Sequence, residues 1–462
     1  MLAANLVLTG GTLVNPGDTA WVLASAALVM LMTPGLAFFY GGMVSSKSVL
    51  NMLMMNFITL GVVGVLWLLY GYSESFGNDA FGRFVGGLHN ALLSHTQGTL
   101  AGPKGDQIPT LAFVMFQLMF AVITPALISG SIADRTKFWA WVLFVVFWVT
   151  IVYFPVAHWV FSFDGFTSPG SLGGWIANKL KAFDFAGGTA VHINAGAAGL
   201  ALAIVLGRRK GWPRTVSRPH NVPHVLLGAA LLWFGWYGFN AGSALAAGDL
   251  ASVAFTTTTI ATGAALLGWI IVEQFRDGKP TTLGAASGAI AGLVAITPAC
   301  GYVDPMGALV IGIAAGVICA IAVGLKYKLG FDDSLDVVGV HLFGGIVGTL
   351  LIGFFADASV NPGGGGNGLF HGGGWNQMWR QAVAAGAVLG YSFVGAFVIG
   401  WIINKTIGFR VSAEAEAVGI DESEHAETAY EFAGPTGTRT SFDSAPTPVP
   451  AVATPAGKGS AS

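Results

Sequence analysis

Two histidines lie within apolar segments and share the same local pattern. Asp184 lies eight residues before His192, and Asp333 lies eight residues before His341. Glycines follow each histidine after four and seven residues: Gly196 and Gly199, then Gly345 and Gly348. An ionisable side chain at membrane depth is costly unless it is paired or lines a cavity, so such a residue indicates function. The two matching patterns predict one internal site built by a duplicated unit.

A pair of histidines in apolar surroundings favours neutral imidazoles, because burial disfavours the charged form. One ring can donate an N–H to the other, which leaves polar edges toward a lumen. A bare cation is excluded from such a lumen, since an unpaired charge in apolar surroundings is far less stable than in water. The pair therefore predicts passage of a molecule that can lose a proton and cross as a neutral amine. Potassium cannot do that.

Aromatic rings and one hydroxyl lie on spans whose ends could reach the outer mouth and attract the charged form of that amine: Phe120, Phe161, Phe239 and Ser243. An aromatic face attracts a cation by about 0.5–2 kcal/mol, and a hydroxyl oxygen accepts a hydrogen bond from an N–H. Asp184 begins the first histidine-bearing span, where a carboxylate caps a helix and adds a negative field. The alternative for Asp184 is a purely structural cap, and the alternative for each phenylalanine alone is core packing.

The composition predicts the elements that hold these residues. Hydrophobic residues make up 54% of the 462 residues and charged residues only 10%, which is typical of an all-α polytopic membrane protein. Apolar stretches of about 20 residues are long enough to span a bilayer as helices. Eleven such spans are predicted, at 19–40, 49–72, 109–131, 138–161, 185–206, 222–244, 251–272, 283–302, 306–325, 335–355 and 378–403.

The placement of basic residues predicts the orientation of these spans. Sixteen of the 21 Lys and Arg residues fall in the loops and ends of one side, which predicts an outside N-terminus and a cytoplasmic C-terminus. Spans 1–5 and 6–10 form two halves with an odd number of helices each, so the second half is expected to be inverted relative to the first. The eleventh span falls outside this repeat.

The composition along the chain predicts four segments. We expect an extracellular N-terminal segment (1–18), a transmembrane domain (19–404), an ordered cytoplasmic tail (405–432) and a disordered extension (433–462) rich in Pro, Thr, Ala and Ser.

Four motifs resemble the ammonium transporter family (Amt/Mep/Rh), in particular its bacterial Amt branch. They are Asp184–Asn194, Gly235–Ser243, Thr297–Tyr302 and Asp336–His341. The resemblance extends from about Asp18 to Phe432. It implies a homotrimer of eleven-helix subunits in the inner (cytoplasmic) membrane, each with its own pore for ammonium or ammonia.

The resemblance also implies roles for single residues. His192 and His341 match the family's twin-histidine pair, Phe120 and Phe239 its stacked outer gate, and Ser243 its external ammonium site. Family members are thought to deprotonate ammonium, pass ammonia through the pore and move the proton separately.

The end of the fourth span departs from the family pattern. The family has tryptophan in its outer ammonium cage where this chain has Phe161, and phenylalanine has the weaker cation–π face. Asp184 matches the acid that the family needs near this site. The segments 408–412 and 424–430 resemble the tail that docks on a neighbouring subunit, where PII-type signalling proteins act in many bacterial members.

Two other classes of protein are alternatives. A membrane enzyme with histidine-bound metal is disfavoured, because no third or fourth ligand recurs at a suitable spacing. An ammonium sensor would share the pore architecture, but 58 residues from Lys405 onward are few for a signalling domain. We therefore expect a transporter with no enzymatic activity, cofactor, metal or nucleic-acid partner.

Overall fold

The computed structural model describes residues 7–9, 12–103, 107–214 and 218–430 of the chain. The predicted disordered extension, 433–462, lies outside the described residues, as do the last two residues of the predicted tail. The principal helices are α1 (Pro16–Met43), α2 (Val49–Leu66), α3 (Tyr72–Phe76), α4 (Thr110–Ser129), α5 (Phe138–Trp148), α6 (Phe154–Phe161), α7 (Asn194–Leu206), α8 (Val222–Gly242), α9 (Asp249–Asp277), α10 (Thr282–Ile296), α11 (Pro305–Ala322), α12 (Leu325–Leu329), α13 (Phe343–Phe355), α14 (Asn376–Thr406), α15 (Ala413–Val418) and α16 (Ile420–His425).

Short helical segments join or extend several of these helices. The π-helical ones are η1 (Trp67–Gly71), η4 (Val149–Tyr153), η5 (Ile176–Leu180), η6 (Gly188–Ile193) and η7 (Val338–Leu342), and the 3-10 ones are η2 (Ala91–Leu93), η3 (Gly130–Ile132) and η8 (Leu369–His371). Strands β1 (Val7–Thr9) and β2 (Thr12–Val14) form one antiparallel pair, and β3 (Leu100–Ala101) and β4 (Ile108–Pro109) form another.

Within the described residues, ten helices are long and apolar enough to cross a membrane, and they coincide with ten of the predicted spans. The eighth predicted span, 283–302, is shorter as a helix because α10 ends at Ile296. Beyond the end of α10, the carbonyl of Pro298 accepts a hydrogen bond from the Phe185 backbone N–H at 3.0 Å. This hydrogen bond joins the chain after α10 to the segment that leads to His192.

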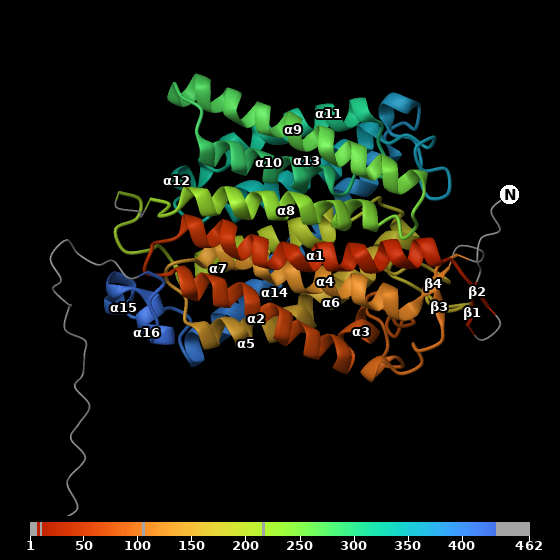
Figure 1. Ribbon diagram of the computed structural model, residues 1–462, viewed down its shortest axis with the longest axis horizontal. Helices are drawn as coiled ribbons and strands as arrows, with labels where there is room; N and C mark the ends of the chain where they lie inside the picture. The colour runs from red at the N-terminus through yellow and green to blue at the C-terminus, as the bar shows by residue number, and fades with distance from the viewer. Residues whose placement is uncertain (1–6, 10–11, 104–106, 215–217, 431–462) are drawn as a thin grey trace, which may run out of the picture. The chain divides into compact units, whose positions relative to one another are not determined.

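Close backbone contacts hold the long helices together. The helices α1 and α8 run side by side (Figure 1). A Cβ on Gly228 would lie only 2.6 Å from the Cα of Phe39, so α8 can approach α1 this closely only with glycine there. Small residues generally allow such packing between membrane helices.

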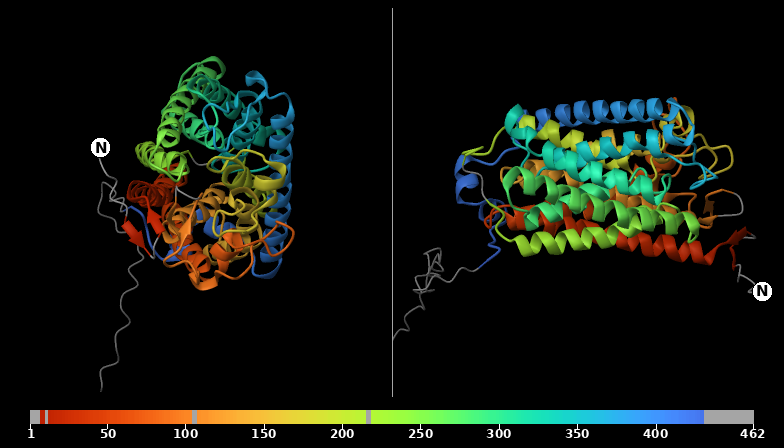
Figure 2. Two further views of the ribbon diagram at one scale, coloured as in Figure 1. Left: turned by 90° about the vertical axis from the view of Figure 1, so that its right-hand side faces the viewer. Right: turned by 90° about the horizontal axis from the view of Figure 1, so that it is seen from above.

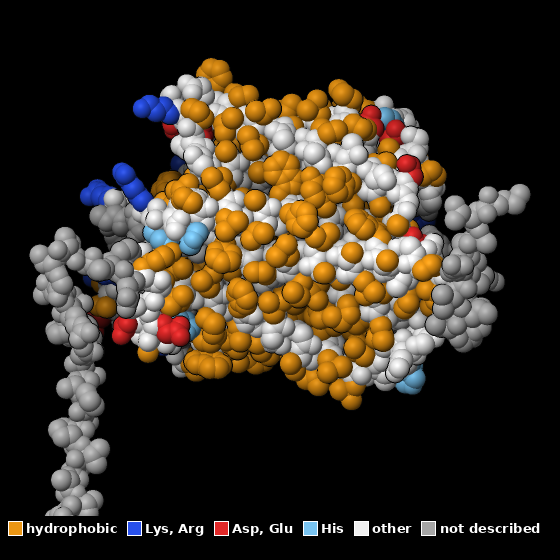
Figure 3. Space-filling model, viewed as in Figure 1, with side chains coloured by type: hydrophobic (Ala, Val, Ile, Leu, Met, Phe, Trp, Pro, Cys, Tyr) orange, Lys and Arg blue, Asp and Glu red, His pale blue; other side chains and the backbone are white. Residues whose placement is uncertain are grey.

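Hydrophobic side chains cover the middle of the face seen in Figure 3, and charged side chains gather toward its two ends. Large exposed apolar residues of the described chain include Phe234, which is 57% exposed, and Leu267, which is 56% exposed. Exposed apolar side chains in such number are stable only against lipid or another protein. The helices, their lengths and this surface define a multi-pass membrane protein.

The longest helix, α14, packs along α7 and α13 at the side of the bundle (Figure 2). The tail that follows it returns to the ends of two other helices. The Asp421 carboxylate accepts hydrogen bonds from the backbone N–H groups of Leu50 (3.0 Å) and Asn51 (2.8 Å) at the start of α2. Glu424 accepts one from Phe138 at the start of α5 (2.9 Å). The tail therefore contacts its own subunit.

Candidate functional site

The structure brings the two histidines of the repeated pattern together. The Nδ1 atoms of His192 and His341 lie 3.3 Å apart, and their ring centroids are 5.4 Å apart. One Nδ1 must donate its hydrogen to the other, so the two rings are opposite tautomers when both are neutral. His192 is 1% exposed and His341 is 3% exposed. Burial of this degree favours the uncharged rings, as expected from the sequence.

Each histidine lies in a π-helical segment that an aspartate caps. Asp184 accepts hydrogen bonds from the backbone N–H groups of Gly187 and Gly188 at 2.7 Å, just ahead of His192. Asp333 accepts them from Val337 at 3.1 Å and Val338 at 2.8 Å, just ahead of His341. A carboxylate at a helix N-terminus satisfies N–H groups that have no partner within the helix. The spacing of eight residues therefore positions each histidine relative to its cap.

Aromatic rings lead from the histidines toward one end of the bundle. The Phe239 ring centroid lies 6.1 Å from that of His192 and 4.3 Å from that of Phe120. The Phe120 ring in turn contacts Phe161 edge-on, with 6.2 Å between centroids. Phe120 on α4, Phe239 on α8 and Phe161 on α6 are all buried. Three helices thus contribute rings to one column that ends at the histidine pair.

A cavity of about 120 Å³ lies at the far end of this column, and for the role proposed below we call it the recruitment cavity. Its lining includes Phe120, Phe161, Asp184 and Ser243, the residues expected to attract a cation. The Ser243 hydroxyl donates its hydrogen to the Phe239 carbonyl at 2.8 Å, so its oxygen is left to accept. A water molecule occupies roughly 30 Å³ in the liquid. The recruitment cavity is therefore large enough for a small hydrated cation.

Several residues of the site were not among those predicted. Gln117, Phe163 and Tyr302 also line the recruitment cavity. Trp236 stacks on His192, with 5.4 Å between ring centroids, and its indole N–H donates to the Thr297 hydroxyl at 2.8 Å. The aromatic and glycine-rich run at the end of the sixth span could have indicated Trp236. Nothing in the sequence indicates that Tyr302, more than a hundred residues after Asp184, lies beside it.

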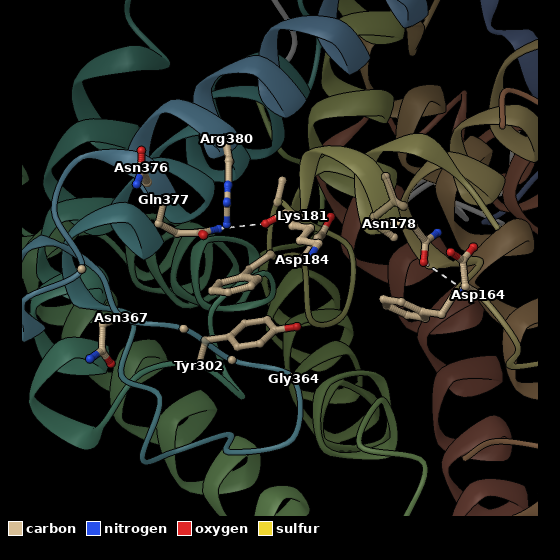
Figure 4. A pocket seen from close by; sticks show the side chains of 18 residues that line it. Asp164, Asn178, Lys181, Asp184, Tyr302, Gly364, Asn367, Asn376, Gln377 and Arg380 are labelled. Atoms are coloured by element: carbon tan, nitrogen blue, oxygen red, sulfur yellow. Dashed lines mark hydrogen bonds between the residues drawn. The ribbon is translucent and has the colours of Figure 1, made fainter. Parts of the chain in front are cut away.

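A second pocket of about 730 Å³ adjoins the recruitment cavity (Figure 4). We call it the side pocket. Phe163, Asp184 and Tyr302 line both spaces. The remaining wall comes from the segment before Asp184, the glycine-rich loop ahead of α14 and the first turns of α14.

Within the described part of the chain, no three or more His, Cys, Asp or Glu side chains group as metal ligands would. The contacts of the two histidines are with each other and with aromatic rings.

Taken together, the bundle and its buried histidine–aromatic column define a polytopic membrane protein with an internal polar site. The chain belongs to the Ammonium Transporter Family, whose family model matches residues 20–430. Members of this family are membrane transporters and not enzymes.

Individual relatives agree with this assignment. The chain is 61% identical over 435 residues to an ammonium transporter of Mycobacterium tuberculosis H37Rv, covering 90% of this chain and 91% of that protein. It is 44% identical over 416 residues to the ammonium transporter Amt1 of Archaeoglobus fulgidus, covering 90% of this chain and all (100%) of that protein. The crystal structure of Candida albicans Mep2 matches with a TM-score of 0.79, 32% identity and 87% coverage of each chain. A solved structure named Sensor Amt Protein also has a TM-score of 0.79, at 28% identity, covering 88% of this chain and 98% of that one.

Proposed function

We propose that this protein moves ammonium or ammonia across the cytoplasmic membrane through a pore in each subunit. In this proposal ammonium binds in the recruitment cavity, loses a proton, and passes the Phe120–Phe239 gate as ammonia. The twin histidines then line its path. The observation that supports the proposal most strongly is the 3.3 Å contact between His192 Nδ1 and His341 Nδ1 at the end of the aromatic column.

The recruitment cavity has the chemistry that a small monovalent cation needs. The rings of Phe120 and Phe161 offer cation–π faces, and the Ser243 oxygen accepts a hydrogen bond from an ammonium N–H. Asp184 adds a negative field without direct contact, because its oxygens are already bound by backbone N–H groups. Together these groups bind ammonium weakly enough to release it.

Deprotonation separates ammonium from potassium. The rings of Phe120 and Phe239, with centroids 4.3 Å apart, give a bare cation apolar surroundings between the recruitment cavity and the histidines. A charge in such surroundings is strongly disfavoured, whereas neutral ammonia passes. The hydrogen-bonded imidazoles accept and donate hydrogen bonds along the path of ammonia, and the proton is moved separately.

The wider assembly is part of the same proposal. We place the recruitment cavity outside and the tail in the cytoplasm, in accord with the excess of Lys and Arg on the tail side. By analogy with the family, the protein works as a homotrimer in the inner membrane. A PII-type protein regulates it from the cytoplasm.

An ammonium sensor is the second candidate, and the likeness to the structure named Sensor Amt Protein favours it. A sensor binds ammonium in the same cavity without sustained transport. The two functions differ in one measurable respect, which is whether ammonium nitrogen accumulates inside sealed vesicles.

Solid-supported-membrane electrophysiology on the purified full chain tests the proposal. We expect ammonium pulses to produce currents that saturate with concentration, and potassium pulses to produce none. An internal pH dye in the same proteoliposomes detects transport that carries no net charge. Protein-free liposomes give the background. Absence of both current and pH change would contradict transport and leave the sensor.

A further inference from the structure

Two cationic side chains line the side pocket, and neither has a partner among the described residues. Arg380 lies on the first turns of α14, and Lys181 lies just ahead of Asp184. Gln377, one turn before Arg380, donates its Nε2–H to the Lys181 carbonyl at 3.4 Å, which brings these two segments together (Figure 4). Within the described residues, neither the Arg380 guanidinium nor the Lys181 ammonium group makes a hydrogen bond or ion pair.

The carboxylates that line the same pocket are engaged elsewhere. Asp164 pairs with Arg83 at 2.7 Å, and this hydrogen bond lowers the pKa of Asp164, so the pair carries no net charge. Asp184 is bound by the backbone N–H groups of its own segment. With the Asp164–Arg83 pair neutral, the single charge of Asp184 offsets at most one of the two cations, so the side pocket keeps a net positive charge.

The other walls leave room for a ligand. Gly364, Gly365 and Gly366 line the pocket and project no side chains into it, and Gly364 lies on the side away from Arg380 (Figure 4). The helix α14 begins without a side-chain cap, so the positive end of its dipole adds to the charge of Arg380. Guanidinium groups bind oxyanions through paired N–H donors, and an ammonium group adds a second point of attraction.

We propose that the side pocket binds a small oxyanion, a phosphate or sulfate group, between Arg380 and Lys181. The bound anion compensates the excess positive charge of this pocket beside the recruitment cavity, with which the pocket shares Phe163, Asp184 and Tyr302. Since uncompensated cations repel ammonium, occupancy strengthens ammonium binding. This second effect rests on the proposed function, whereas binding of the anion does not.

Binding is tested first, by isothermal titration calorimetry of the purified full chain with inorganic phosphate and with sulfate in a chloride buffer. We expect saturable binding of both. Arg380→Gln and Lys181→Gln should each weaken it at least about tenfold, because a charge-assisted hydrogen bond is lost. Lys179→Gln is the matched control, since Lys179 is exposed two residues from Lys181 and does not line the pocket. Monodisperse elution in size exclusion shows that each variant is folded.

The coupling is tested in proteoliposomes by the ammonium concentration that gives half-maximal transport. Phosphate should lower this concentration about two- to fivefold in the unsubstituted protein and leave it unchanged in Arg380→Gln. Adding phosphatidylglycerol to the vesicles separates two sources of the anion. If a lipid phosphate occupies the pocket, free phosphate does not lower the half-maximal ammonium concentration further in those vesicles. If only the free ion occupies the pocket, free phosphate still lowers it.

Three results would overturn the inference. One is the absence of phosphate and sulfate binding at millimolar concentration. Another is equal binding by folded Arg380→Gln and the unsubstituted protein, or an equal loss in Lys179→Gln. A third is an ammonium concentration for half-maximal transport that does not change when the anion binds. That result would remove the coupling but leave the proposed transport intact.

Discussion

Gly196 of α7 lies directly against the backbone of Leu342, the residue that follows His341. A Cβ on Gly196 would come within 2.5 Å of the Leu342 nitrogen. The reciprocal contact also exists, because a Cβ on Gly345 would lie 3.1 Å from the nitrogen of Ile193, the residue that follows His192. Such mutual contacts arise when two segments are related by a two-fold axis. They support the inverted repeat and explain why a glycine stands four residues after each histidine.

Phe161 should limit the affinity of the recruitment cavity. Phe161→Trp is expected to lower the half-saturating ammonium concentration about twofold, since tryptophan has the stronger cation–π face by a fraction of ~1 kcal/mol. Concentration-dependent currents measure this change. Phe147→Trp on the exposed surface of α5, where Phe147 is 45% exposed, is the control. An unchanged half-saturation in Phe161→Trp would show that this ring does not face the bound ammonium.

The tail should influence transport through the helix ends that it caps. Neither α2 nor α5 has a cap from its own N-cap side chain, and Asp421 supplies one for α2. Truncation after Lys405 should lower transport while the protein stays assembled. Asp421→Ala should weaken tail docking by about 1 kcal/mol, the usual cost of a lost cap.

Transport rates and size exclusion on the same preparations test the role of the tail. Glu427→Gln serves as the control, because Glu427 is exposed on the tail. Full activity after truncation would remove the tail from the mechanism.

Protonation of Asp332 should lower the free energy of unfolding at acid pH. Burial acts to raise the pKa of this carboxyl, but hydrogen bonds from Arg209 and the charges of Arg209 and Arg135 outweigh burial, so its pKa is lowered. A lowered folded pKa means that the ionised carboxylate stabilises the fold above the unfolded value of about 3.9. That stabilisation is lost as the pH falls through the folded pKa.

Thermal unfolding followed by circular dichroism between pH 3 and about pH 7 tests this. Asp332→Asn should be less stable at neutral pH by about 3–5 kcal/mol, because Arg135 and Arg209 lose a buried partner, and its stability should vary less with acid. Asp277→Asn removes an exposed ion pair and should change little. A pH profile of Asp332→Asn that parallels the unsubstituted protein would contradict the assignment.

Much of this architecture follows from sequence patterns. Spans are predictable because a bilayer requires long apolar helices, and the structure has a helix at each predicted span. The pairing of His192 with His341 follows from their repeated pattern, since equivalent positions of a two-fold repeat meet near its axis. Asp184 was predicted both as a cap and as an acid near the cation site, and it caps η6 while lining the recruitment cavity.

Other features depend on contacts that no local pattern encodes. The helix α10 ends at Ile296, and the Pro298 carbonyl beyond it bonds Phe185, whereas α4 continues through Pro125 in the same four-residue sequence Ile-Thr-Pro-Ala. The side pocket and the position of Tyr302 arise from loops that are distant in sequence. A single sequence contains no local pattern that predicts such contacts.

We propose that the neutrality of His192 excludes ions that cannot lose a proton. His192→Asp would put a carboxylate into the pore, draw in water and lower the barrier to intact cations. His192→Gln is the matched control, because an amide keeps the wall neutral. If His192 had only a packing role, the buried charge of the introduced aspartate would destabilise the protein and create no conductance.

The most direct measurement is the potassium-evoked current of both variants in proteoliposomes, on protein that elutes as one species in size exclusion. We predict a potassium current in His192→Asp with reduced discrimination for ammonium, and none in His192→Gln. A folded His192→Asp variant that still admits ammonium and still rejects potassium would contradict the claim that His192 enforces selectivity.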